Sequence, residues 1–171
     1  MHFLGLSLSL ADGTIYDNLQ RDLYAGLKSG IFCLLCGYAN AKETVETGEL
    51  VSYEKLHGGR AFSRTFRSTV VNPFARIFGR DCSLLRRVSG FFDGEELEHG
   101  DCSIRIFALP LVPITIILWT KSSEFPAAAS VLFDSSINYY ISTEEASILG
   151  DLTLARMRDA ARILQNSKTE F

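Results

Sequence analysis

The segment Ile114-Thr115-Ile116-Ile117-Leu118-Trp119 decides the fold, because it is an apolar run rich in β-branched residues. Such side chains fit the pleated, half-buried surface of a sheet. The segment lies within the longest uncharged run of the chain, residues 106–120, which Pro110 and Pro113 interrupt. A membrane helix needs about 20 apolar residues. The sequence therefore predicts a buried central strand here and no contact with a membrane.

Shorter patterns on both sides of this segment predict further strands. Residues 101–107 and 50–56 alternate apolar and polar side chains, and residues 129–133 form another short apolar run. At the start of the chain, residues 3–10 place leucine at every second position, and Asp12-Gly13 is a pair that favours a tight hairpin. Residues 14–19 are the expected second arm of that hairpin.

Four stretches with helical spacing of apolar residues predict helices at residues 21–37, 61–79, 82–91 and 143–165. Pro73 is expected to kink or split the second helix after Asn72, because proline lacks a backbone donor and clashes with the preceding turn. Asp81 is the expected N-cap of the third helix, and Ser142 or Thr143 that of the fourth. We therefore predict an α+β fold with a mixed or antiparallel sheet of about five strands, packed against three or four helices.

The chain has 171 residues, of which 47% are hydrophobic and 22% charged. This composition excludes disorder over most of the chain, and the length suits one domain with a sizeable core. No repeat or linker marks a boundary. We predict a single domain over residues 1–166 and a frayed C-terminal tail at residues 167–171.

The cysteines and the N-terminal residues bear on where the protein works. No positive residue precedes the apolar start, Met1-His2-Phe3-Leu4, as a secretory signal would require. Cytoplasmic proteins keep their thiols reduced. The sequence therefore predicts a cytoplasmic protein whose four cysteines, at 33, 36, 82 and 102, are free thiols.

Cys33 and Cys36 form a C-x-x-C motif on a predicted helix, so both thiols point to roughly the same side. Two thiolates can hold half of a metal site or form a redox pair. The neighbouring residues are apolar, however, and free cysteine commonly packs as a small hydrophobic residue. We expect both cysteines in the core and no cofactor, with a metal or redox role as the alternative.

Seven arginines and one acid lie between Arg60 and Arg87. Arg60, Arg64 and Arg67 follow helical spacing and share a face, and their planar guanidinium groups suit phosphate or carboxylate. One interpretation is an anion site, and the other is an exposed face whose arginines pair with acids at 43–54 and 93–101. The net charge of −3 and the lack of a recognisable motif argue against nucleic acid as a partner. Residues 92–100 are predicted to form an exposed acidic loop.

The second half of the chain resembles a family through an ordered series of short motifs. These are Gly100-Asp101-Cys102-Ser103, Leu109-Pro110-Leu111-Val112-Pro113, Leu118-Trp119, Glu124-Phe125-Pro126-Ala127-Ala128, Val131-Leu132-Phe133-Asp134-Ser135 and Thr143-Glu144. In these residues the chain resembles an uncharacterised domain family of anaerobic bacteria and archaea, some of whose members are fused to a four-cysteine iron–sulfur module. The resemblance covers roughly residues 50–150. It implies a setting in anaerobic metabolism, near corrinoid or iron–sulfur enzymes, and no activity.

Aromatic side chains gather around these motifs. Trp119 and Phe125, with Glu124 and Asp134, could line a pocket for a ligand or partner; they could equally belong to the core beneath a structured loop. Since Trp119 continues the central strand, we expect it to be largely buried, with Glu124-Phe125-Pro126 folded back over it. Glu124 should then meet a backbone donor or an arginine.

Three functions remain open on these observations. The leading hypothesis is a non-catalytic binding or accessory protein, with a protein partner or a small-molecule ligand. The competing hypothesis is an enzyme for a small anionic substrate, anchored by an arginine, with Glu124, Asp134 or His57 as acid or base. The third is a metal or redox protein that uses Cys33 and Cys36. An exposed apolar patch over a filled interior would favour the first.

Overall fold

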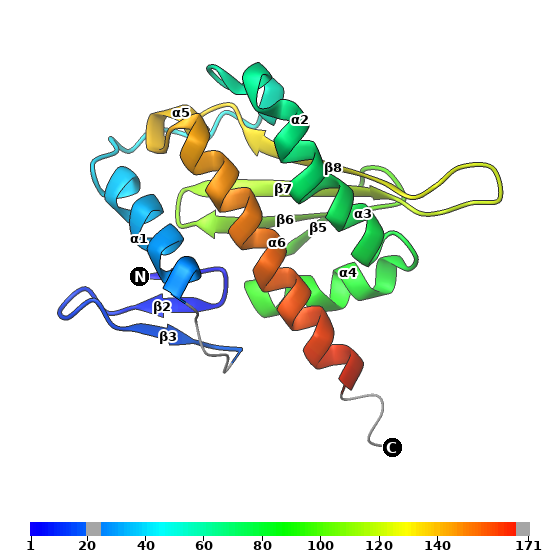
Figure 1. Ribbon diagram of the computed structural model, residues 1–171, viewed down its shortest axis with the longest axis horizontal. Helices are drawn as coiled ribbons and strands as arrows, with labels where there is room; N and C mark the ends of the chain where they lie inside the picture. The colour runs from blue at the N-terminus through cyan, green and yellow to red at the C-terminus, as the bar shows by residue number, and fades with distance from the viewer. Residues whose placement is uncertain (20–24, 167–171) are drawn as a thin grey trace.

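A computed structural model describes residues 1–19 and 25–166; the predicted start of the first helix and the predicted tail at 167–171 lie outside these residues. The fold is α+β, as predicted, with two antiparallel sheets (Figure 1). The strands are β1 (His2–Phe3), β2 (Leu6–Leu8), β3 (Ile15–Asp17), β4 (Leu50–Ser52), β5 (Glu95–Leu97), β6 (Cys102–Leu109), β7 (Val112–Trp119) and β8 (Ala128–Asp134). The helices are α1 (Ala25–Ala39), α2 (Ser63–Phe66), α3 (Asn72–Phe78), α4 (Cys82–Ser89), α5 (Ile137–Tyr140) and α6 (Thr143–Asn166).

The larger sheet has the strand order β4-β8-β7-β6-β5. The segment that starts at Ile114 therefore lies in the middle of the sheet, and the predicted central strand is confirmed. The prediction of a loop over residues 92–100 was wrong in part, because Glu95–Leu97 pairs with β6 and forms the edge strand of the sheet. Glu95 lies opposite Arg105 there and forms an ion pair with it, so an acidic sequence is accommodated at an exposed sheet edge.

The smaller sheet is formed by the N-terminal residues in the order β1-β2-β3. The predicted hairpin around Asp12-Gly13 is present, with Leu8 opposite Ile15. The expected single strand at residues 3–10 was wrong, because the chain turns at Leu4 and Gly5, where φ is +47° and +68°. Leucine rarely adopts this left-handed conformation. The Leu4 carbonyl accepts a hydrogen bond from Nε of Arg156, a residue of α6.

The second predicted helix is divided near Pro73, as expected, but before Asn72 and not after it. Residues 67–71 form a wider π-helical turn between α2 and α3, in which the Asn72 N–H donates to the Arg67 carbonyl. Pro73 lacks a donor and would clash with a carbonyl four residues earlier in a regular helix. The wider turn relieves this conflict, and the segment from α2 to α3 packs against β8.

The N-caps predicted for the last two helices are also confirmed. Asp81 Oδ1 accepts a 2.8 Å hydrogen bond from the Ser83 N–H at the start of α4. At the start of α6, the Glu145 N–H donates to Ser142 Oγ and the Ser142 N–H donates to Glu145 Oε2, at 3.2 and 2.7 Å. Such a reciprocal capping box satisfies two backbone donors that the first turn of a helix leaves free.

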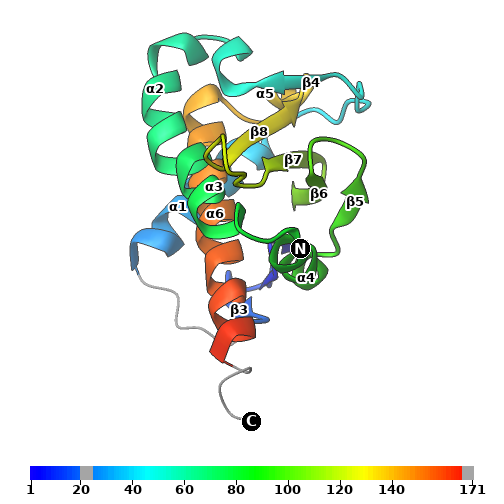
Figure 2. The same cartoon turned by 90° about the vertical axis from the view of Figure 1, so that its right-hand side faces the viewer.

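Successive residues of the central strand point to opposite faces of the sheet. Ile114, Ile116 and Leu118 are fully buried on the face that α6 and α3 cover (Figures 1 and 2). On the opposite face, Thr115 is 1% exposed. The loop of residues 40–49 crosses this face, where Glu46 pairs with Arg105, the residue opposite Thr115. One side of the sheet is thus covered by helices and part of the other by a loop.

Gly150 allows α6 to approach α2 closely, which gives a testable consequence. A Cβ atom at Gly150 would lie 2.6 Å from Cε2 of the buried Phe66 ring. We expect Gly150→Ala to lower the free energy of unfolding by about 1–3 kcal/mol, as overpacked cores do, measured by urea denaturation. Gly90→Ala is the matched control, because nothing lies within 4 Å of a Cβ there. Equal stabilities of the two variants would contradict the close approach.

Candidate functional site

A groove of about 420 Å³ runs between β8 and the α2–α3 segment. Its strand side is the stretch of residues 127–132, and its closed end is formed by Ser52, Tyr53 and Glu54. The helix side consists of Ser63, Phe66, Arg67, Val71, Asn72 and Ala75. Figure 2 shows α2 and α3 standing beside β8, with β4 above.

The groove exists because β4 is much shorter than β8. Pairing between them covers only Leu132 to Asp134, and at Tyr53 the chain leaves the sheet for a short 3₁₀ helix, Tyr53–Lys55. The Tyr53 ring stacks on Phe66 with centroids 4.3 Å apart, and its hydroxyl donates to the Thr143 carbonyl. These contacts fix the point at which β4 ends and leave the rest of β8 open toward the helices.

The predicted arginine site reaches this groove through one residue. Arg60, Arg64 and Arg67 are all exposed, and only Arg67 lines the groove. Of the seven arginines between 60 and 87, Arg86 forms an ion pair with Glu96 at 2.9 Å, and the other six form none within residues 1–19 and 25–166. Arg67 thus brings a guanidinium that has no ion pair among the described residues into a groove whose one acidic lining residue is Glu54.

Asp134 lies outside this groove, and its carboxylate is fully engaged. It is 2% exposed and accepts hydrogen bonds from the N–H groups of Thr47, Gly48 and Ser136 at 3.1, 2.7 and 2.9 Å, and from Thr47 Oγ1 at 2.9 Å. Burial raises the pKa of Asp134, but the hydrogen bonds from Ser136 and Thr47 outweigh it and bring the pKa to about 2. The side chain therefore holds the 40–49 loop against β8 as an anion at neutral pH.

Trp119 and Phe125 are surface residues, so the expected burial was wrong. Their exposed fractions are 42% and 69%, and Glu124 is exposed beside them. Strand alternation explains Trp119, because it shares the face of Thr115, whereas Leu118 points to the helices. The 40–49 loop contacts this face at Arg105 and Asp134, well before the end of β7. Among the described residues, the Glu124 carboxylate has neither a backbone donor nor an arginine as a partner, contrary to expectation.

Residues 12–156 match the family model described as Domain of unknown function (DUF3786). The chain belongs to this family. The match is longer than the 50–150 stretch of the sequence motifs, and it includes the groove, Asp134 and the exposed aromatic residues. No curated protein and no solved structure matches the chain.

In this DUF3786 domain the C-x-x-C cysteines lie on the surface, so the expectation that they belong to the core was wrong. Cys33 and Cys36 are both exposed on α1, whereas Ile31 and Leu34 are fully buried. Two residues along a helix correspond to a rotation of about 200°, so the two pairs occupy opposite faces. Within the described residues, no group of three or more histidine, cysteine or acidic side chains is placed to hold a metal ion.

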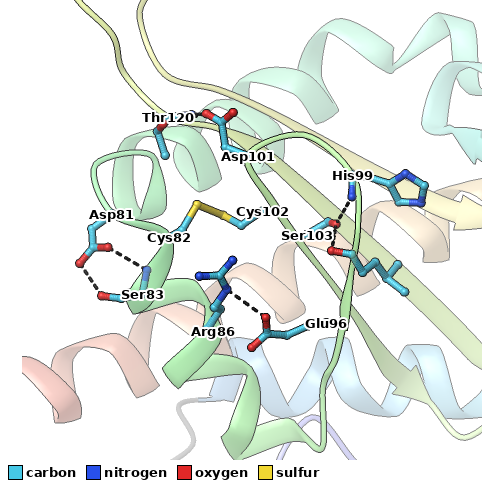
Figure 3. Close-up of a disulfide and its surroundings, with 11 residues drawn as sticks. Asp81, Cys82, Ser83, Arg86, Glu96, His99, Asp101, Cys102, Ser103 and Thr120 are labelled. Carbon is cyan, nitrogen blue, oxygen red and sulfur yellow. Dashed lines mark hydrogen bonds and ion pairs between the residues drawn. A yellow bond between two sulfur atoms is a disulfide. The ribbon is translucent and has the colours of Figure 1, made fainter.

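The other two cysteines form a disulfide, which corrects the prediction of four free thiols. Cys82, at the start of α4, is bonded to Cys102, at the start of β6 (Figure 3). Thr120 donates to Asp101 from its hydroxyl and its N–H, both at 2.7 Å, and these bonds lower the pKa of Asp101. The disulfide thus joins the N-capped start of α4 covalently to the start of β6, next to the hydrogen bonds between Asp101 and Thr120. The 20-residue separation alone gave no signal for this pairing.

The groove residues Ser63, Asn72 and Ala129 were missed from the sequence. Serine, asparagine and alanine carry no chemical signature, and only the early end of β4 gives them a shared surface. Separately, none of the helices in the described part of the DUF3786 domain is long and apolar enough to cross a membrane.

The lowered pKa of Asp134 predicts that the free energy of unfolding depends on pH. Its folded pKa lies below its ordinary value of 3.8, so its stabilising effect is complete above that value and is lost as pH falls toward 2. Asp134→Asn should lower the unfolding free energy at pH 7 by about 2 kcal/mol, and this deficit should shrink between about pH 4 and pH 2. Urea denaturation across pH measures both; a deficit independent of pH would contradict the anionic role.

The disulfide makes a second prediction. Replacing both partners, by Cys82→Ser and Cys102→Ala, should lower the unfolding free energy by about 2–4 kcal/mol, as expected for a loop of this length. The control, Cys33→Ser with Cys36→Ser, should change stability little, since both side chains are exposed. Titration of the native protein with a thiol reagent should find two free thiols. Four would show that the bond does not form.

Proposed function

We propose that this DUF3786 domain is a non-catalytic accessory protein that binds a partner protein through an exposed aromatic loop. The aromatic loop is defined as residues 119–126 and carries Trp119 and Phe125. Its exposure is the observation that carries the proposal: large aromatic side chains contribute most to binding where a partner can bury them. Two such residues on one loop, above a filled interior, favour a binding surface.

The competing enzyme hypothesis finds less support. Asp134 accepts four hydrogen bonds and does not line the groove, and Glu124 is exposed on the aromatic loop. His57 is also exposed, and its backbone is engaged with Asn138 and Thr143. Arg67 could anchor an anion, but Glu124, Asp134 and His57 do not line the groove with it. An acid–base pair needs both groups within reach of one substrate.

The biological setting of the proposal comes from the family resemblance. The resemblance supports the proposal of a role in anaerobic metabolism linked to corrinoid or iron–sulfur enzymes. The disulfide weighs against the cytoplasm, because reducing compartments rarely preserve such bonds. A partner protein fits this setting without a cofactor bound to the chain itself.

The proposal is tested by removing the two aromatic rings together. Trp119→Ala with Phe125→Ala should leave the melting temperature nearly unchanged, because both rings are exposed. Affinity purification from the native organism, without oxygen, should recover a partner with the parent and lose it with this variant. Phe62→Ala is the control, since Phe62 is another exposed aromatic residue, 53% accessible.

The parent protein provides a second readout, since it has one tryptophan. Native fluorescence should lie near the wavelength of water-exposed indole and shift to shorter wavelength when the partner binds. The proposal fails if the double variant recovers the same proteins as the parent, or if it unfolds because the two rings are part of the core.

A further inference from the structure

We propose that the free edge of β8 in the groove binds an extended peptide segment of a partner protein, with an acidic side chain of that segment on Arg67. The peptide would lie in line with β4 and add a strand to the sheet, which is a recurring mode of peptide recognition. The inference rests on the proposed function, because both require that the protein binds a partner protein. It uses a different surface from the aromatic loop and is tested separately.

The register shows which backbone groups face the groove. The Ser135 N–H donates to the Glu49 carbonyl, so odd-numbered residues at this end of β8 direct their N–H and C=O groups toward β4. Along the same strand, Ala129 points its backbone groups the same way. No strand pairs with it on this side in the described part of the chain, because β4 ends opposite Leu132.

The groove has the size and side chains that an added strand requires. Four residues of strand, Ala128 to Val131, extend about 13 Å, and the space beside them is about 420 Å³. Ala127, Ala128, Ala129 and Ser130 carry small side chains and let another backbone approach. Exposed edges are normally protected by charged residues, proline or bulges, and residues 128–131 contain no charge and no proline.

The charge around the groove selects the peptide. Between residues 52 and 76 the chain has five basic side chains and one acidic one, Glu54. Arg67 lines the groove and forms no ion pair within the described residues, and Arg60 and Arg64 are exposed on the adjoining turns. A guanidinium binds a carboxylate through two parallel hydrogen bonds. An extended segment with an acid opposite Arg67 is therefore the complementary partner.

The free protein allows a first test by amide hydrogen exchange. The Ala129 N–H faces the groove and the Ser130 N–H faces β7, so Ala129 should exchange at least about tenfold faster. Slow exchange at Ala129 in the free monomer would show that the edge is already covered and would overturn the inference. A concentration-dependent dimer that slows this exchange would overturn it too, because a second copy would then be the occupant.

The second test uses a displayed library of random eight-residue peptides as the probe. Selected peptides should be enriched in Asp or Glu and should protect the Ala129 amide. Arg67→Glu should weaken a selected peptide at least about tenfold, while Arg158→Glu, an exposed charge reversal on α6, should not. N-methylation of alternate peptide amides should abolish binding and leaves the protein itself unchanged.

Each outcome has a definite meaning. The inference is overturned if no peptide is selected, if the selected peptides lack acids, or if inorganic phosphate competes with them fully while N-methylation has no effect, since a plain anion site would explain that. Trp119→Ala with Phe125→Ala should leave peptide affinity unchanged. If that variant abolishes peptide binding, the peptide binds the aromatic loop and the groove is not its site, whereas the proposed function survives.

Discussion

The buried ion pair between Arg156 and Asp17 is the interaction on which the two halves of the fold depend. Arg156 lies in the middle of α6 with a side chain that is 0% exposed, and the Asp17 side chain at the end of β3 is 5% exposed. The guanidinium donates to both carboxylate oxygens and, through Nε, to the Leu4 carbonyl at 3.1 Å. Residues 139 positions apart in sequence are joined at one point in the core.

Such a pair fixes the relative position of two elements more than it raises the free energy of unfolding. Burying two charges costs free energy that their attraction only partly returns, but removing one partner leaves an uncompensated charge and typically costs about 3–5 kcal/mol. Here the guanidinium also accounts for the unusual backbone at Leu4, whose carbonyl it binds and whose φ is +47°. The small sheet is thereby fixed to α6, and α6 is fixed across the large sheet that carries the groove.

Sequence periodicity predicted the elements whose residues have a clear apolar side. The central strand, the hairpin at Asp12-Gly13, the division at Pro73 and the caps at Asp81 and Ser142 all follow from local chemistry. α1 is apolar nearly all round, so its sequence did not distinguish the face of Ile31 from the face of Cys33. The same lack of contrast hid the outward direction of Trp119.

Long-range pairings had no local signal at all. Arg156 looks like any charged residue on an amphipathic helix, Asp17 like a turn residue, and Cys82 and Cys102 like two of four thiols. Their partners are defined only once the chain has folded. The groove belongs to the same class, because it depends on the point at which β4 stops pairing with β8.

Packing around Tyr53 determines the residue at which β4 stops pairing with β8. Tyr53 leaves the sheet to stack on Phe66, and Gly59 sits so close that a Cβ atom would lie 2.0 Å from the Tyr53 carbonyl oxygen. Phe66 in turn meets Gly150 of the helix that Arg156 holds in place. A longer β4 would cover β8 but would pull Tyr53 out of this contact. The core that stabilises the domain therefore also makes β4 end opposite Leu132, beside the groove that Arg67 lines.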